Sequence, residues 1–166
     1  MKTPPWTRNE ILRAMKGLKN KKSRDPTNLA NKLFNPKVAG EDLIEAVQKL
    51  MNRIKSDLIF PDCLNLCNIT SIYKQKGPIN EFSSYRGIFR VQALRNILEL
   101  LLYYDEYPKI DKNLSDCNVG CRKDRNIRDN IFVLQAVLND TRNGSKQPID
   151  ISVYDVIKCF DSLWVQ

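Results

Sequence analysis

The sequence contains no histidine, and this absence removes several kinds of catalytic and metal site. Serine and cysteine nucleophiles activated by an imidazole, HExxH zinc sites and C2H2 zinc fingers all require that side chain. The phosphate-binding glycine loops GxxxxGK[ST] and GxGxxG are also absent. Any catalysis by this sequence would therefore have to use carboxylates, bound metal ions or cationic side chains.

Long apolar segments are absent as well. The longest apolar run, ILELLLYY at 97–104, is too short to span a bilayer, and MKTPPW at the start has no apolar signal core. The five cysteines form an odd set without a signal peptide. These features predict an intracellular protein with reduced thiols, nuclear or cytoplasmic, not secreted and without a membrane partner.

The cysteine spacing leaves one metal site open. Cys63 and Cys67, and likewise Cys117 and Cys121, are separated by three residues and could nominally form a four-cysteine zinc site. The long spacing, the absence of flanking glycines and the apolar surroundings favour buried structural thiols instead.

Charge is unevenly balanced in favour of cations. The sequence has 27 Lys and Arg residues and 19 Asp and Glu residues, which gives a net charge of +8. This excess favours a polyanionic partner, with nucleic acid ahead of a membrane surface. With 166 residues and 42% hydrophobic side chains, the chain is expected to fold as one domain.

The first third of the chain predicts two helices. Thr7 and Glu10 fit a capping box, and Trp6 and Ile11 fit the hydrophobic staple around it. The basic turn KNKKSRDP ends this first helix. After Gly40, apolar residues recur at helical spacing, which predicts a second helix; they are Leu43, Val47, Leu50 and Ile54.

The middle of the chain predicts a β-hairpin near 68–90. Residues 66–73 are β-branched and alternating, and 85–91 form a second short apolar run. The connecting loop, KQKGPINEFSS, is long and basic. A helix over 92–106, a loop containing Pro108 and Gly120, and a helix that starts at Ile127 and ends near Asn143-Gly144 are expected to follow.

The hairpin carries a group of cations. Lys74, Lys76 and Arg86 cluster on it, with Tyr73 and Tyr85 interleaved. Cations on a stiff hairpin suit a triphosphate or a nucleic-acid backbone. The alternative is an exposed edge on which lysines discourage pairing with other strands.

A second group of cations crowds the start of the helix predicted from Ile127. In CRKDRNIRDN, the cations crowd a helix N-terminus, where positive charge opposes the helix dipole. This arrangement hints at an external anion; the residues are Arg122, Lys123, Arg125 and Arg128.

The last stretch, IDISVYDVIKCFDSLW, predicts a strand at 149–155 that leads into a short helix at 156–164. A carboxylate at the end of a strand, such as that of Asp155, can hold Mg²⁺ together with substrate phosphates. The alternative role of Asp155 is to cap the helix that follows. Asp161 lies within that helix.

Taken in order, these segments resemble the first half of a reverse transcriptase, in particular those of non-LTR (LINE-type) retrotransposons. ITSIYKQKG followed by SSYRGIF resembles the family's hairpin motif, I-x-x-I-x-K-x-G then N-[YF]-R-[PG]-I. NVGCRKDRNIRDNIF resembles the next motif, and SVYDVIKCFDSLW resembles the first palm motif, D-x-x-[KR]-[AC]-F-D. Cys121 stands where the family usually has an aromatic residue, and Gly87 where many relatives have proline.

The resemblance implies a role for each motif residue. Asp155 would be the first catalytic, metal-binding aspartate of the palm. Lys74 and Arg86 would steady the incoming triphosphate. The residues expected along the template and primer are Lys76, Arg122, Lys123 and Arg125. The residues expected to support the site are Asp161, Tyr85 and Gly120.

The fold implied is a mainly helical α+β chain, an incomplete fingers–palm with fingers at about 1–145 and the start of the palm at about 146–166. The full-length enzyme would add deoxynucleoside triphosphates to a DNA primer on an RNA template, using Mg²⁺ or Mn²⁺. The later palm aspartates of the family are missing from this sequence, so we expect this chain alone to be inactive.

Two alternatives stay open. One is a non-catalytic basic protein that binds nucleic acid. The other is an inert retroelement relic whose exposed sheet edge promotes aggregation.

Overall fold

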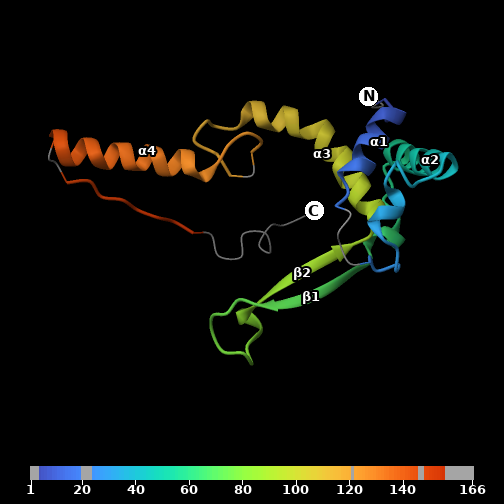
Figure 1. Ribbon diagram of the computed structural model, residues 1–166, viewed down its shortest axis with the longest axis horizontal. Helices are drawn as coiled ribbons and strands as arrows, with labels where there is room; N and C mark the ends of the chain where they lie inside the picture. Colours follow the sequence, from blue (N-terminus) through green and yellow to red (C-terminus); the bar gives the residue numbers. More distant parts are fainter. Residues whose placement is uncertain (1–3, 20–23, 121, 146–147, 156–166) are drawn as a thin grey trace. The chain divides into compact units, whose positions relative to one another are not determined.

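The computed structural model describes residues 4–19, 24–120, 122–145 and 148–155 (Figure 1). Helices and a two-stranded antiparallel sheet make it a mixed α+β protein, as the sequence predicts. The chain divides into two compact units, Met1–Lys112 and Asn113–Gln166. The separation of fingers from palm near residue 145, which the resemblance implies, is a different division and stays a prediction.

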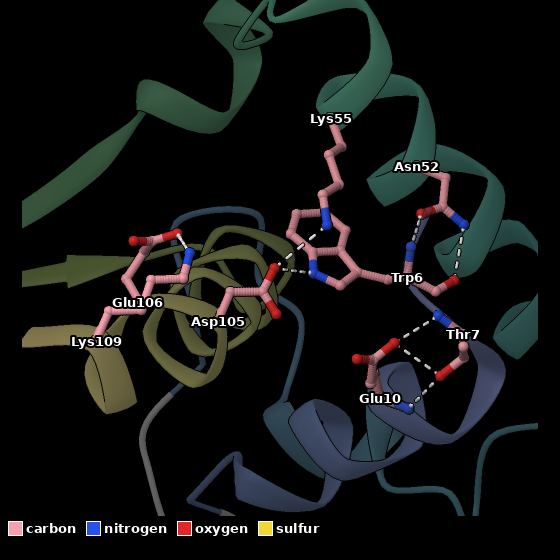
Figure 2. A network of polar contacts seen from close by, with 8 residues as sticks. All are labelled: Trp6, Thr7, Glu10, Asn52, Lys55, Asp105, Glu106 and Lys109. Atoms are coloured by element: carbon pink, nitrogen blue, oxygen red, sulfur yellow. Dashed lines mark hydrogen bonds and ion pairs between the residues drawn. The ribbon is translucent and has the colours of Figure 1, made fainter. Parts of the chain in front are cut away.

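α1 (Arg8–Gly17) begins at the predicted capping box. The Thr7 backbone N–H donates to Glu10 Oε2 at 2.7 Å, and the Glu10 backbone N–H donates to Thr7 Oγ1 at 3.4 Å (Figure 2). Trp6 and Ile11, the predicted staple residues, are 3% and 0% exposed. Local interactions therefore fix where α1 starts, and its first turn is anchored in the core.

α2 (Glu41–Asp57) starts after the predicted Gly40, which is its N-cap residue. Its apolar residues recur at helical spacing, as predicted. The row of side chains that is buried, however, consists of Ile44, Val47 and Met51. The other predicted residues border this stripe and are partly buried; they are Leu43, Leu50 and Ile54. Two neighbouring stripes of this helix are apolar, so spacing alone does not select the one that is buried.

α3 (Ala93–Asn113) is longer than the sequence predicts, because it continues through Pro108. The expected loop at Pro108 is therefore wrong. Proline costs a helix interior one backbone hydrogen bond, but side-chain contacts one turn apart span this position. The Tyr107 hydroxyl donates to Asp111 Oδ1 at 3.2 Å, and Lys109 Nζ lies 2.7 Å from Glu106 Oε1. Such contacts between side chains three and four residues apart support the helix on both sides of the proline.

The core of the first unit lies where α1, α2 and α3 come together, at the end of the hairpin opposite its connecting loop in Figure 1. All three helices contribute to its largest fully buried side chains, which are Ile11, Met15, Met51, Ile97 and Leu101. Short 3-10 helices join the longer elements: η1 (Asn31–Phe34), η2 (Asp62–Asn65) and η3 (Phe82–Ser84).

The predicted hairpin is confirmed. β1 (Cys67–Tyr73) pairs antiparallel with β2 (Tyr85–Val91), from Cys67 opposite Val91 to Tyr73 opposite Tyr85. In Figure 1 the two strands extend from the helices and end in the connecting loop. Most side chains of both strands are exposed, so backbone pairing contributes more to this ribbon than burial does.

In the second unit, the predicted helix is also confirmed. α4 (Ile127–Asp140) begins at a capping box formed by Asn126 and Asp129, and a π-helical turn, η4 (Thr141–Ser145), follows it. Among the described residues, none of the α4 side chains is buried. The predicted apolar face is therefore present but exposed.

The predicted strand at 149–155 is not formed. Residues 148–155 have no regular secondary structure, and Val153 and Tyr154 are 89% and 90% exposed. A strand requires a hydrogen-bonded neighbour, and within the described residues the only pairing is that of β1 with β2. The helix expected at 156–164, including Asp161, lies outside the described residues. No described helix has the length and apolar character needed to cross a membrane.

Candidate functional site

The loop at the end of the hairpin is held by the two tyrosines that close the sheet. Tyr73 and Tyr85 face each other in the last pair, with ring centroids 5.5 Å apart. The Tyr73 hydroxyl donates to the Gly77 carbonyl at 2.6 Å, and the Tyr85 hydroxyl donates to the Ile79 carbonyl at 2.8 Å. The strands therefore position both halves of the loop through these two tyrosines, and the predicted supporting role of Tyr85 at a nucleotide site stays a prediction.

Gly77 allows this loop to close. Its φ is +87°, in the region that side chains disfavour, and a Cβ there would lie 2.6 Å from Ser84 Oγ. Ser84 is itself buried, and its carbonyl accepts a hydrogen bond from the Lys74 backbone N–H at 2.8 Å. The close approach of Gly77 to Ser84 thus fixes the backbone that carries Lys74.

The predicted hairpin cations surround one hollow. Lys74, Lys76 and Arg86 line a depression of about 350 Å³. Lys74 Nζ donates to the Ser83 carbonyl at 2.8 Å. Lys76 and Arg86 are exposed and make no ion pair with any described residue. The structure therefore brings these three cations together, with two of them available to an external anion.

One carboxylate shares this hollow. Glu81 lines it, and Glu81 Oε2 accepts a hydrogen bond from the Ser83 hydroxyl at 3.2 Å. With three cations against one anion, the hollow keeps a net positive charge. Its electrostatics suit a phosphate group more than a neutral ligand.

The predicted cations of the second unit are engaged with their own loop. Arg122 Nη1 donates to the carbonyls of Ser115 and Asn118 at 2.9 and 3.2 Å. Arg125 Nη2 lies 3.1 Å from Asp116 Oδ1. These contacts hold the loop before α4 in place. An external anion would therefore have to share the N–H donors of Arg122 and Arg125 with these loop residues.

Lys123 and Gly120 lie in the same loop. Lys123 Nζ is 3.9 Å from Asp124 Oδ2, and both side chains are largely exposed. Gly120 is exposed, and a Cβ there would approach no atom more closely than 3.8 Å. Nothing in the described geometry requires glycine at this position.

The predicted metal ligand, Asp155, is exposed and lies in the segment without regular secondary structure. In the described parts of the chain, no three cysteine, aspartate or glutamate side chains gather in a way that could hold a metal ion. Asp161 lies outside the described residues, as does Cys121 of the nominal zinc site. Cys63, Cys67 and Cys117 carry free thiols; Cys63 and Cys117 are exposed and Cys67 is half-buried, so the prediction of buried thiols is wrong for these three cysteines. Magnesium binding and zinc binding both stay predictions.

Asp25 is a positioning residue that the sequence reasoning missed. Its Oδ1 accepts from the backbone N–H and hydroxyl of Thr27 at 2.9 and 2.6 Å and from the Leu29 N–H at 2.9 Å. Its Oδ2 accepts from the Ala93 N–H at 3.1 Å. Asp25 therefore holds the first residue of α3, two residues after the end of β2. The sequence Asp-Pro-Thr at 25–27 could have indicated this role, because in such turns the aspartate side chain accepts a hydrogen bond from the backbone N–H two residues later.

Hydrogen bonding also sets the charge of this buried group. Burial raises the pKa of Asp25, but the bonds from the Thr27 hydroxyl and the N–H groups of Ala93, Leu29 and Thr27 lower it by more. The resulting pKa lies below the ordinary aspartate value, so the carboxylate is ionised at neutral pH.

No protein-family model matches this chain, and no curated protein matches it. The residues and contacts described above therefore carry the functional argument.

Proposed function

We propose that these residues are the fingers and the first part of the palm of an RNA-directed DNA polymerase of the retrotransposon type. Three sequence motifs in the family's order support this, as does the hairpin that joins two of the motif segments. The observation that carries the proposal is the hollow at the hairpin loop, with Lys74, Lys76 and Arg86 around it.

In this proposal the hairpin binds the triphosphate of an incoming nucleotide. Ammonium and guanidinium groups form short, charge-assisted hydrogen bonds with phosphate oxygens, and they offset its negative charge. The tyrosine-braced loop would hold the backbone that carries these cations, so little backbone entropy would be lost on binding.

Asp155 would supply one oxygen ligand to a Mg²⁺ ion, which prefers carboxylate ligands together with substrate phosphates. Two-metal phosphoryl transfer needs further carboxylates, and the sequence contains no Asp-Asp pair. We therefore propose that the 166-residue chain alone does not extend a primer.

A second candidate is non-catalytic binding of nucleic acid. The net charge of +8 favours it, and so do the separate basic clusters on the hairpin and before α4. This function needs neither Asp155 nor a metal ion.

Salt-dependent binding of single-stranded RNA and of a deoxynucleoside triphosphate tests the proposed role of the hairpin. We expect the Lys76→Gln and Arg86→Gln variants to weaken the binding of RNA and of the triphosphate. For RNA, each lost phosphate contact should reduce the slope of log binding constant against log salt concentration by about one. Lys37→Gln is the matched control, because Lys37 is also exposed but lies far along the chain from the hairpin. Equal effects of all three changes would remove the hairpin from the binding surface.

Binding of a deoxynucleoside triphosphate separates the two candidates. Triphosphate binding that strengthens with Mg²⁺ and weakens in Asp155→Ala would support the polymerase proposal, whereas RNA binding without triphosphate binding would support the second candidate. RNA-templated incorporation by the 166-residue chain, abolished by Asp155→Ala, would contradict the proposed inactivity.

A further inference from the structure

The hairpin loop contains a carboxylate, that of Glu81, which phosphate binding does not explain. Glu81 lines the hollow of about 350 Å³ together with Lys74, Lys76 and Arg86. Within the described residues, it forms no ion pair with these cations or with any other side chain. Phosphate oxygens carry negative charge, so a carboxylate repels them. A ligand that suits all four side chains therefore carries a hydrogen-bond donor as well as a phosphate.

The backbone positions Glu81 from both sides. Its N–H donates to the Pro78 carbonyl at 3.3 Å, and its carbonyl accepts a hydrogen bond from the Ser84 N–H at 3.1 Å. One carboxylate oxygen, Oε2, accepts a hydrogen bond from the Ser83 hydroxyl at 3.2 Å. No described residue donates to the other oxygen, Oε1. The loop thus holds Glu81 in one backbone conformation and leaves Oε1 open to a donor.

Glu81 also lines a second, smaller hollow. The volume of this smaller hollow is about 270 Å³, and Ile79, Phe82 and Tyr85 form its apolar wall. The Tyr85 hydroxyl donates to the Ile79 carbonyl at 2.8 Å, which ties two sides of this wall together. Because Glu81 belongs to the lining of both hollows, the apolar wall and the cations are neighbours.

Phe82 exposes its aromatic ring in the smaller hollow. The side chain is 95% exposed, more than any other large apolar side chain in the described parts of the chain. Surfaces that bind single-stranded nucleic acid combine such rings, on which bases stack, with cations that contact the backbone phosphates. An exposed ring beside the hairpin cations therefore fits a base that is joined to a phosphate.

The charge of the two hollows supports the same ligand. Their combined lining has three cations and one carboxylate, so its net charge is positive. Lys76 and Arg86 form no ion pair with a described carboxylate, and this positive charge is therefore not cancelled within the described chain. A polyanion meets favourable electrostatics here.

The open oxygen of Glu81 distinguishes between bases. Adenine, cytosine and guanine each carry an amino group, whereas uracil offers two carbonyl oxygens and a ring N–H. An amino group donates a hydrogen bond to a carboxylate, as in contacts of glutamate with the amino group of cytosine. Bases become accessible to such contacts in single strands, because a duplex keeps them stacked and paired.

We propose that the hairpin loop binds a nucleotide of single-stranded RNA whose base carries an amino group. The base stacks on Phe82, its amino group donates to Glu81 Oε1, and its phosphate binds to Lys76 and Arg86. This inference rests on the proposed phosphate contacts of the hairpin, which both candidate functions share, and it adds a preference for certain bases.

Fluorescence anisotropy with labelled octamers of single-stranded RNA tests the amino contact. One octamer has a single adenosine among uridines, and in the other octamer purine riboside, which lacks the amino group, replaces this adenosine. The two bases have the same ring system, so the difference in affinity reports the amino group. We expect the adenosine octamer to bind about fivefold more tightly, because it adds one hydrogen bond to a charged group.

Glu81→Ala separates this contact from simple charge repulsion. We expect the variant to lose the preference for adenosine over purine riboside, while its affinity for the purine riboside octamer rises because a negative charge is removed. Glu45→Ala is the matched control, since Glu45 is an exposed glutamate of α2 and its loss changes the net charge by the same amount. The preference for adenosine should be unchanged in this control.

Phe82→Leu tests the stacking contact. We expect it to weaken the binding of both octamers by about tenfold, because leucine has no aromatic face on which a base can stack. Phe82 is 95% exposed and contributes little to packing, so the variant should fold. Phe132→Leu is the matched control, because Phe132 is 72% exposed but lies on α4.

Several results would overturn the proposal. These are equal affinity for the two octamers, a preference for adenosine that survives Glu81→Ala, or equal losses from Phe82→Leu and Phe132→Leu. A preference for free adenosine triphosphate over purine riboside triphosphate, without the same preference in RNA, would exclude an RNA strand as the ligand and would also overturn it.

The phosphate contacts have their own readout. Lys76→Gln and Arg86→Gln should weaken the binding of both octamers and keep the preference for adenosine. If these variants weaken binding but no preference exists, the base contact fails and the phosphate role of the hairpin stands. If the preference exists and these variants change nothing, the proposed phosphate role fails instead.

Discussion

Asp25 Oδ2 accepts a hydrogen bond from the Ala93 backbone N–H at 3.1 Å, between residues 68 positions apart in the sequence. This bond joins the turn after α1 to the start of α3, close to the point where the hairpin meets the helices. Asp25 and Ala93 are both buried, so water does not replace the contact readily when one partner is lost.

Replacing Asp25 with asparagine should destabilise the chain by about 1–3 kcal/mol, because one acceptor is lost and a buried N–H group is left unpaired. Urea unfolding followed by circular dichroism measures the change. Asp57→Asn is the control, since Asp57 makes only exposed contacts, with Arg53 at 3.4 Å and with the neighbouring Ser56 hydroxyl at 2.7 Å, and exposed contacts of this kind contribute little to stability. Equal effects of the two substitutions would contradict the structural role of Asp25.

The same carboxylate should make stability depend on acidity. Because the pKa of Asp25 is lower in the folded chain than its ordinary value of 3.8, ionisation favours the folded state. The contribution of Asp25 is complete above the unfolded pKa and is lost as pH falls through the folded pKa. The difference in stability between the natural chain and Asp25→Asn should therefore shrink below about pH 4.

This difference isolates Asp25 from other acidic groups. Hydrogen bonding to Lys49 and to Ser56 lowers the pKa values of Glu45 and Asp57, respectively, but both residues are present in both proteins. A difference in stability that stays constant from about pH 7 down to about pH 2 would contradict the prediction.

Gly77→Ala should distort the hairpin loop, because a Cβ at this position meets Ser84 Oγ at 2.6 Å and the backbone has a φ of +87°. The left-handed backbone alone costs about 1–2 kcal/mol for a residue with a side chain. Amide chemical shifts of residues 74–84 should change, and RNA affinity should fall. Gly87→Ala is the control, because its Cβ would meet ordinary contacts of 3.5 and 3.6 Å.

Pro108→Ala should stabilise the second half of α3. Alanine restores the missing backbone donor and removes a helix-interior proline, which costs about 3 kcal/mol. Helical circular dichroism and the melting temperature should both rise. Pro78→Ala, in the hairpin loop, is a control that should leave helix content unchanged, and a fall in helicity for Pro108→Ala would contradict the prediction.

Local signals in the sequence predicted the structure well where neighbouring residues decide it. The capping box at Thr7 and Glu10, the start of α2 after Gly40 and the hairpin pairing all follow from short-range patterns. The hairpin cations were likewise predictable, because the register of the two strands brings Lys74 and Arg86 to the same end.

The features that the sequence did not reveal depend on distant partners. The bond from Ala93 to Asp25 spans 68 positions, and no periodicity in the sequence signals it. The strand at 149–155 has the right composition but lacks a paired neighbour among the described residues. The continuation of α3 through Pro108 depends on contacts between side chains that propensity does not include.

The contacts of Trp6 also give the chain an optical reporter. Its indole ring meets Lys55 of α2 and Asp105 of α3, and its backbone bonds to Asn52. Separation of these segments would expose the ring to water and shift its emission to longer wavelength. In a Trp164→Phe background, one fluorescence signal would follow the assembly of α1, α2 and α3, while circular dichroism would follow all helices together. A difference between the two transitions would reveal whether α4 melts independently of this core.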